Sequence, residues 1–283
     1  MTTLLFIGDI VGEPGLQFLE TNLPELIQMY GADFVIANAE NLHLEDHPNG
    51  PCGMTNSELA RLFAASVQLV TGGNHSWDGP QGATVHDDPR VLRPLNVSSS
   101  SPGRGAGIVS SRSGVRLGVV NLAGRSAIPT VSNPFPALEA QLQIWGVGTD
   151  ASSVDAVLVD HHGESVFEKI TLAHAFSGRI AALVGTHTHV PTMDAGLLPG
   201  GVAFVSDVGM TGPSGGAQGY DPAPFVQNMR FPGDARTPMR LASGTVELGA
   251  VLIQLEGSRA VGIERLTLQP STAQQTAVPE LMR

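Results

Sequence analysis

The sequence predicts an α/β fold in which a second β-sheet packs on the first. Short continuous runs of apolar residues, each ended by polar residues or glycine, are typical of buried parallel-type strands. The first three runs alternate with two helix-like segments, and this alternation is typical of βαβ units. The second half of the chain has more strands per helix than the first, which favours two packed sheets over one doubly wound sheet.

The expected strands and helices follow one another in chain order. The five clearest strands cover residues 4–8, 34–37, 67–72, 156–159 and 181–185. Four further strands are expected near residues 116–121, 202–206, 249–255 and 261–268. Helices are expected over residues 15–30 and 55–65, and the second opens with Thr55 and Glu58 at the spacing of a capping box.

Residues 1–268 are expected to form one domain, because the composition marks no division along them. Residues 42–54 combine Pro, Gly, His and Asp, and residues 96–107 are rich in Ser, Gly and Pro, so both stretches are expected to be loops. Residues 269–283 are polar and contain proline, which predicts a C-terminal surface tail.

Composition excludes several classes of function. The formal net charge of -11 opposes binding to long nucleic acid, which needs a dense Lys/Arg surface. The single cysteine, Cys52, excludes an intrachain disulfide and a thiolate zinc cluster, and it fits a reducing cytoplasm. The N-terminus has no basic leader region, and no apolar stretch approaches the roughly 18 to 20 residues of a membrane span. We therefore expect a soluble cytoplasmic protein.

Residues of metal-binding or acid–base type follow each of the five clearest strands. Each residue alone has an ordinary explanation, such as turn formation by an aspartate, so the combination carries the prediction. The carboxyl ends of parallel strands form the ligand-binding edge of a sheet, and residues far apart in sequence converge there. The last two candidates would share one face of an extended segment, as alternate side chains do. In chain order the candidates are Asp9, Asn38, Glu40, Asn41, Asn74, His75, Asp160, His161, His162, His187 and His189.

The candidate ligands predict a centre with two metal ions. Carboxylate, carboxamide and imidazole groups without thiolate suit Mn, Fe, Zn or Mg, and the many histidines favour transition metals. Seven good ligands exceed what one ion takes from a protein, whereas two ions that share the Glu40 carboxylate would use them all. The seven are Asp9, Glu40, Asn41, Asn74, His162, His187 and His189. With Asp9 and Glu40 as the only anionic ligands, two divalent ions would leave the site positive and attractive to phosphate.

Three short motifs resemble those of the calcineurin-type metallophosphoesterases. They are GD at residues 8–9, GNH at 73–75 and GTHTH at 185–189, beside the family motifs GD, GNH and GHxH. Four segments resemble the bacterial YmdB-like branch, whose members are known as cyclic-nucleotide phosphodiesterases: DIVG at 9–12, NAEN at 38–41, GNHSWD at 73–78 and SDVGMTGP at 206–213. The resemblance extends from residue 4 to about residue 268.

The resemblance implies a metallophosphoesterase αββα fold, which is a sandwich of two β-sheets flanked by helices, with two iron or manganese ions at the strand ends. Two ligand sets that share Glu40 would hold the ions: Asp9, Glu40, Asn41 and His189 in one, and Glu40, Asn74, His162 and His187 in the other. The sequence DHHGE at 160–164 matches the branch's Asp-x-His-x-Glu block, which selects His162 over His161. Residues 42–53 are longer than the loop that follows Glu-Asn in the branch.

One histidine outside the two ligand sets is expected to act in catalysis. A hydroxide that bridges the two ions would attack phosphorus in line, and His75 would protonate the leaving alkoxide as general acid. A tight turn at Gly72 and Gly73 would let Asn74 face the metal while His75 faces the leaving group. Asp78 would either orient the His75 imidazole or cap the following segment.

Several further residues have two interpretations each. Arg125 follows a strand and would either grip a phosphate of the substrate or form a structural salt bridge. His43 and His47 would either line the substrate mouth or be solvated or structural residues. Residues 209–219 would form a lid over the site or an ordinary glycine-rich loop. Cys52 is expected to be incidental.

The leading functional interpretation is a phosphodiesterase that acts on small cyclic or linear nucleotides. The same metal chemistry would serve a phosphomonoesterase or a protein phosphatase. A third interpretation is a regulatory protein that keeps its metals but binds RNA or a protein partner, and the acidic charge and the presence of His75 count against it. The sequence does not define the oligomeric state and is compatible with a homo-oligomer.

Overall fold

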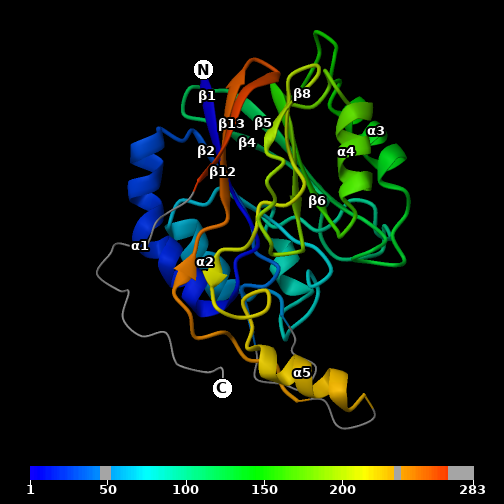
Figure 1. The fold of residues 1–283 in the computed structure, drawn as a ribbon. Coiled ribbons are helices and arrows are strands. Elements are labelled where there is room, and N and C mark those ends of the chain that lie inside the picture. The colour runs from blue at the N-terminus through cyan, green and yellow to red at the C-terminus, as the bar shows by residue number, and fades with distance from the viewer. Residues whose placement is uncertain (45–51, 233–236, 267–283) are drawn as a thin grey trace.

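The computed structural model describes residues 1–44, 52–232 and 237–266. Within these ranges two β-sheets lie face to face, and helices cover the outer face of each sheet (Figure 1). This architecture confirms the predicted α/β sandwich. His47, residues 45–51 of the predicted 42–53 loop and the whole of the predicted tail at 269–283 lie outside the described residues.

The first sheet joins the start of the chain to its C-terminal region. Its strands are, in spatial order, β13 (Arg259–Leu266), β12 (Ala250–Glu256), β1 (Thr2–Ile7), β2 (Phe34–Asn38) and β3 (Leu69–Thr71). β1, β2 and β3 run parallel, whereas β12 pairs antiparallel with both β1 and β13. The β12–β13 hairpin therefore lies beside the N-terminal strand.

The second sheet is built mainly from the middle of the chain. Its strands are, in spatial order, β4 (Ala106–Ser110), β5 (Arg116–Ala123), β6 (Ala156–His162), β7 (Ala182–Thr186), β9 (Val202–Val205) and β8 (Gly196–Leu198). The inner strands β5, β6, β7 and β9 run parallel, and β4 and β8 are antiparallel edges. All nine predicted strands are present. The edge strands β4 and β8 were not predicted, because both are partly exposed and lack a continuous apolar run.

Four helices cover the sheets, and a fifth projects from them. α1 (Gly12–Tyr30) and α2 (Asn56–Ala64) pack on the first sheet, and α3 (Pro134–Ile144) and α4 (Val166–Ala175) pack on the second. α5 (Pro222–Arg230) projects at the lower end of the view in Figure 1. The capping box predicted for Thr55 and Glu58 is present at the start of α2. None of the helices in the described part of the chain is long and apolar enough to cross a membrane.

Three short elements complete the described structure. β10 (Gly212–Pro213) and β11 (Val246–Glu247) form a small antiparallel pair, and Thr84–Asp87 form one turn of 3-10 helix.

The inner strands β1, β2, β5, β6, β7 and β9 are buried on both faces, because each sheet lies between the other sheet and its own helices. On β1, Leu4 and Phe6 pack in the core between the sheets, and Leu5 and Ile7 pack in the core under α1 and α2. All four side chains are 0% exposed. Burial of each such side chain contributes about 1.5–3 kcal/mol. Two-sided burial therefore explains the continuous apolar runs from which the strands were predicted.

The carboxyl ends of the parallel strands of both sheets meet at one end of the sandwich. Nδ2 of Asn38, the last residue of β2, donates a hydrogen bond to Oδ2 of Asp160 in β6 at 3.1 Å. Oγ1 of Thr71, the last residue of β3, donates to the same oxygen at 2.5 Å. Side chains that follow these strands therefore face one another across the two sheets.

Candidate metal centre

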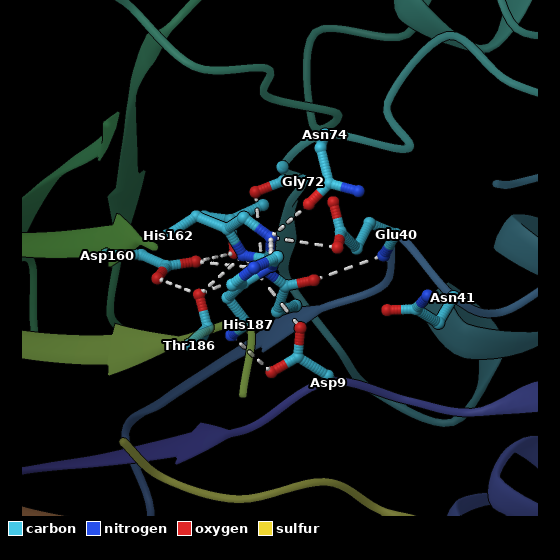
Figure 2. Close-up of polar contacts among 12 residues, drawn as sticks. Asp9, Glu40, Asn41, Gly72, Asn74, Asp160, His162, Thr186 and His187 are labelled. Atoms are coloured by element: carbon cyan, nitrogen blue, oxygen red, sulfur yellow. Dashed lines mark hydrogen bonds and ion pairs between the residues drawn. The ribbon is translucent and has the colours of Figure 1, made fainter. Parts of the chain in front are cut away.

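One group of candidate ligands surrounds Nε2 of His162. This nitrogen lies 2.9 Å from Oε1 of Glu40, 3.0 Å from Oδ1 of Asn74 and 3.0 Å from Nδ1 of His187. Ligand atoms of Glu40, His162 and His187 all lie within 4.8 Å of one another. Figure 2 shows these side chains pointing toward a common centre. Carboxylate, amide and imidazole atoms gathered in this way form a suitable set of donors for a transition-metal ion.

A buried network fixes the orientation of the His162 ring. Nδ1 of His162 lies 2.9 Å from Oγ1 of Thr186, and that hydroxyl donates to Oδ1 of Asp160 at 2.7 Å. The hydroxyl proton is thus committed to Asp160, so the hydroxyl oxygen accepts from Nδ1–H. Nε2 is then the nitrogen that can bind an ion, which is the usual arrangement behind a metal-binding histidine.

Asp160 and His161 lie outside the group of ligands. The sequence predicted that residues 160–162 follow a strand that ends at residue 159. β6 instead continues to His162, so these residues belong to the strand. Asp160 is fully buried behind the His162 ring, and this burial raises the pKa of its carboxyl to about 6. His161 points to the opposite face of the strand, because side chains alternate along it. Of the three candidates on β6, only His162 reaches the cluster.

A second group of candidate ligands surrounds His189. Nε2 of His189 lies 3.2 Å from Oδ1 of Asn41 and 3.9 Å from Oδ1 of Asp9. Its other nitrogen, Nδ1, donates to the backbone oxygen of Gln218 at 2.9 Å, which leaves Nε2 facing the two oxygens. Oδ1 of Asp9 is buried and has no hydrogen-bond donor among the described residues. A buried carboxylate oxygen is costly without a positive partner, so a cation fits this position.

The charges of the cluster depend strongly on burial. Burial raises the pKa of the Asp9 carboxyl, and His189 and His162 offset only part of this effect. Burial also opposes ionisation of Glu40 and His162, but their mutual attraction outweighs it, holding the pKa of Glu40 at about 2 and that of His162 at about 9. Burial and the neighbouring His162 lower the pKa of His187 to about 3. A neutral His187 ring keeps a lone pair for an ion.

The backbone around His187 and His189 is not extended. β7 ends at Thr186, and φ is +104° at His187 and +62° at His189. The prediction that these two side chains share one face of an extended segment was therefore wrong, because both residues have positive φ. With this backbone, the His187 side chain lies in the group around His162, and the His189 side chain lies in the second group, beside Asn41.

His75 lies beside the first group but outside it. Its backbone N–H donates to Oε2 of Glu40 at 3.1 Å, and Nδ1 of its ring lies 2.8 Å from Oδ2 of Asp78. The side chain of His75 is 30% exposed, so a substrate can reach it. Gly73 permits this close packing, since a Cβ atom at that position would collide with Oε2 of Glu40 and the ring of His162.

Two predicted substrate contacts lie apart from both groups. Arg125 is exposed, and its Nε donates to the backbone oxygen of Val131 at 3.4 Å. Its charge acts on Glu168 of α4, and no contact between Arg125 and a candidate ligand is found in the described residues. Nδ1 of His43 lies 2.9 Å from Oε1 of Glu58, at the capping box of α2. The structure therefore ties His43 to a helix end.

Several residues that touch the candidate ligands were missed by sequence reasoning, among them Glu164 and Tyr220. Oε1 of Glu164 lies 3.2 Å from Nε2 of His187, which leaves Nδ1 of that ring for the cluster. The sequence contained a signal for Glu164, because this residue ends the Asp-x-His-x-Glu block. The hydroxyl of Tyr220 accepts from Nδ2 of Asn41 at 3.4 Å and contacts Sγ of Cys52 at 3.4 Å. Nothing local in the sequence marks Tyr220, because its place beside Asn41 depends on the tertiary fold.

The fold and the cluster together define a class of protein. Two packed sheets carry carboxylate, amide and imidazole donors at their strand ends, and Asp9 holds an unpartnered buried oxygen among the described residues there. This combination is that of a metallophosphoesterase, which is a hydrolase of phosphate esters.

Comparison with known proteins identifies the family within this class. The family model described as YmdB-like protein matches residues 5–266, so the chain belongs to this family. The 2',3'-cyclic-nucleotide 2'-phosphodiesterase of Bacillus subtilis strain 168 is 35% identical over 268 residues, which are 94% of this chain and 96% of that protein.

Two solved structures are similar over nearly the whole chain. A protein from Thermus thermophilus superposes with a TM-score of 0.82 at 35% identity, covering 93% of this chain and 97% of that one. A Mycoplasma pneumoniae protein described as a novel phosphatase superposes with a TM-score of 0.83 at 28% identity, covering 94% of this chain and 93% of that one. These matches confirm the fold and the family expected from the sequence motifs.

Proposed function

We propose that this protein is a dinuclear metal-dependent phosphodiesterase that hydrolyses small cyclic nucleotides. The observation that carries the proposal is the convergence of Oε1 of Glu40, Oδ1 of Asn74 and Nδ1 of His187 on Nε2 of His162. The name of the Bacillus subtilis relative supports the cyclic-nucleotide substrate. The small number of carboxylates and the many imidazoles favour iron or manganese as the two ions.

The proposed ligands form the two sets that share Glu40. Asp9, Asn41 and His189 would complete the first set, in which the buried Oδ1 of Asp9 supports a bound cation. Asn74, His162 and His187 would complete the second. Within the described residues the Glu40 carboxylate contacts His162 of the second set and the N–H of His75, so its bridging role rests on its position beside Asn41 in the chain.

When bound, the two ions would stabilise the charge that develops on the phosphoryl group and activate water as the nucleophile. The chain's own residues would supply the proton for the leaving group. His75 is held through its backbone by Glu40 and through Nδ1 by Asp78, so that Nε2 is left to donate. We assign the role of general acid to His75 and the role of orienting its ring to Asp78.

The relatives also supply a second candidate for the substrate. The Mycoplasma pneumoniae protein is described as a phosphatase, and a phosphomonoester would use the same donors. We favour the diester, since the Bacillus subtilis relative is matched at higher identity and over a similar length. A cytoplasmic location is part of the proposal and is supported by the single cysteine, which is buried and free.

Metal analysis of the purified protein, combined with three substrates, tests this function. Bis(p-nitrophenyl) phosphate, p-nitrophenyl phosphate and 2',3'-cyclic AMP should be assayed with Asp9→Ala, which should lose both metal and turnover. His174→Ala is a matched control, because it removes an exposed histidine in the last turn of α4 that is not among the candidate ligands. Two bound ions and preferred turnover of the diesters support the proposal. Preference for the monoester favours the phosphatase, and metal binding without turnover favours a regulatory role.

A further inference from the structure

Lys169 is the only lysine among the 283 residues of this chain, and it is buried beside the candidate metal centre. It lies on α4 and is 1% exposed. Its Nζ donates to the backbone oxygens of Thr186 at 3.1 Å and Ser206 at 2.7 Å, and it lies 3.7 Å from Oδ2 of Asp207. A buried ammonium is unfavourable unless it is paired and hydrogen-bonded. Thr186, Ser206 and Asp207 meet this need from the ends of β7 and β9.

The groups that Lys169 binds adjoin the two histidines at the end of β7. Thr186 directly precedes His187 in the chain. Oδ2 of Asp207 accepts the backbone N–H of Thr188, between the histidines, at 3.0 Å, and Oδ1 accepts the N–H of Gly209 at 2.8 Å. The ion pair therefore holds residues 186–188 through one carbonyl oxygen and one N–H.

The segment that is held in this way is strained. Both histidine positions have positive φ, which non-glycine residues adopt only when their surroundings impose it. The N–H of His187 donates to Oδ2 of Asp9 at 3.2 Å, and Nε2 of Gln218 donates to the oxygen of Thr188 at 2.9 Å. Lys169 and Asp207 add further contacts to this backbone, from the side of α4 and β9.

A lysine suits this position better than the arginine that the chain uses everywhere else. An ammonium is compact and donates in three directions, whereas a guanidinium is planar and larger. The space is tight, because a Cβ atom added at Gly185 would lie 2.8 Å from Nζ of Lys169. An arginine here would displace the carbonyl oxygens of Thr186 and Ser206 that the ammonium fits between.

We propose that Lys169, paired with Asp207, is a positioning residue that sets the backbone of residues 186–189 so that His187 and His189 each reach a ligand group. This inference rests on the proposed function, in which both histidines hold ions. The pair touches neither ion nor substrate, so it acts through the histidines alone.

Metal affinity measured by calorimetry on metal-free protein tests the proposal. Lys169→Met should weaken binding of Mn²⁺ by about 10- to 100-fold, which is the effect expected for residues that orient metal ligands. Lys169→Arg keeps the charge but not the shape and should also weaken binding. Arg179→Met is the matched control, because it breaks an ion pair with Glu139 away from the site, and it should leave Mn²⁺ affinity unchanged.

A double variant separates positioning from simple stability. Lys169→Met leaves the Asp207 charge without its counter-ion, so Lys169→Met/Asp207→Asn should recover thermal stability of the metal-free protein without recovering Mn²⁺ affinity. Recovery of both would show that Lys169 only stabilises the fold and would overturn the proposal. Unchanged affinity in a folded Lys169→Met or Lys169→Arg variant would overturn it as well.

The unmodified protein offers a test that does not depend on a variant folding. Because Lys169 is the only lysine, protein labelled with ¹³C-lysine should give one set of lysine side-chain signals, and Zn²⁺ should shift them as the site fills. Signals that do not move while Zn²⁺ binds would overturn the positioning role alone. A wild-type protein that binds neither Mn²⁺ nor Zn²⁺ would overturn the proposed function, and the positioning role with it.

Discussion

The strand ends of the first sheet supply oxygen atoms to the candidate metal centre, whereas those of the second sheet supply nitrogen atoms. The oxygens follow β1, β2 and β3 and belong to Asp9, Glu40, Asn41 and Asn74. The nitrogens lie at the ends of β6 and β7 and belong to His162, His187 and His189. Neither sheet carries a complete set of the proposed ligands, so the candidate site forms only when the two sheets pack together.

The two sheets also hold their ligands in different ways. On the second sheet, buried polar side chains fix the histidines: Asp160 and Thr186 behind His162, and Lys169 with Asp207 behind His187. On the first sheet, the buried Asn38 side chain accepts the N–H of Glu40 at 3.1 Å, and close packing adds a second constraint at Gly73, where the absence of a Cβ atom admits Glu40 and His162. The first sheet should therefore be sensitive to added volume as well as to lost hydrogen bonds.

Loss of one ligand from either sheet should have the largest effect. Asp9→Ala and His187→Ala remove one donor each, and each should lower diester hydrolysis by about 10³-fold or more, because bound ions contribute several kcal/mol to the transition state. Metal content measured on the purified variants should fall in parallel. A variant from one sheet that keeps both its metal and its rate would show that this sheet does not supply ligands.

His75→Ala should separate catalysis from metal binding on the first sheet. Loss of a general acid typically lowers the rate by about 10²- to 10⁴-fold. The metal content should stay at the wild-type value, because the ring of His75 contacts Asp78 and none of the proposed ligands. The rate loss should be larger for 2',3'-cyclic AMP than for bis(p-nitrophenyl) phosphate, whose leaving group needs less protonation. Equal losses on the two substrates would contradict the acid role.

Thr186→Val and Thr71→Val form a matched pair across the two sheets. Both hydroxyls donate to Asp160, at 2.7 Å and 2.5 Å, and both variants should lose about 1–3 kcal/mol of unfolding free energy. Only Thr186 also contacts His162, so only Thr186→Val should weaken metal binding, by about 10- to 100-fold. Chemical denaturation and calorimetry provide the two measurements. Equal metal affinities in the two variants would mean that the Thr186 contact does not orient His162.

Glu164→Ala should have the smallest effect. Glu164 contacts Nε2 of His187 at 3.2 Å, but its side chain is 57% exposed, so water can replace the contact. We expect metal affinity to fall by about tenfold or less, and Glu164→Gln to keep more of it, because the amide oxygen can still accept from His187. Titration of metal-free protein with Mn²⁺ would show whether this order holds.

Much of the fold was predictable because a strand that is buried on both faces has a continuous run of apolar residues in the sequence. Residues 4–8 and 156–159 are continuous apolar runs, and each lies in a strand that is covered on both sides. β4 is a partly exposed edge strand and has no such continuous apolar run. The helices α3 and α4 were also not predicted, although the side chains of Asn133 and Ser165 cap their N-termini in the structure.

The sequence by itself determined the kinds of candidate ligand and the strands that carry them, because residue type and burial are properties of a local segment. Tertiary structure alone decided the positive φ of His187 and His189, the place of Asp160 behind His162, and the burial of Lys169 against the end of β7. Each of these depends on contacts between residues that lie far apart in the chain. No pattern within one segment contains that information.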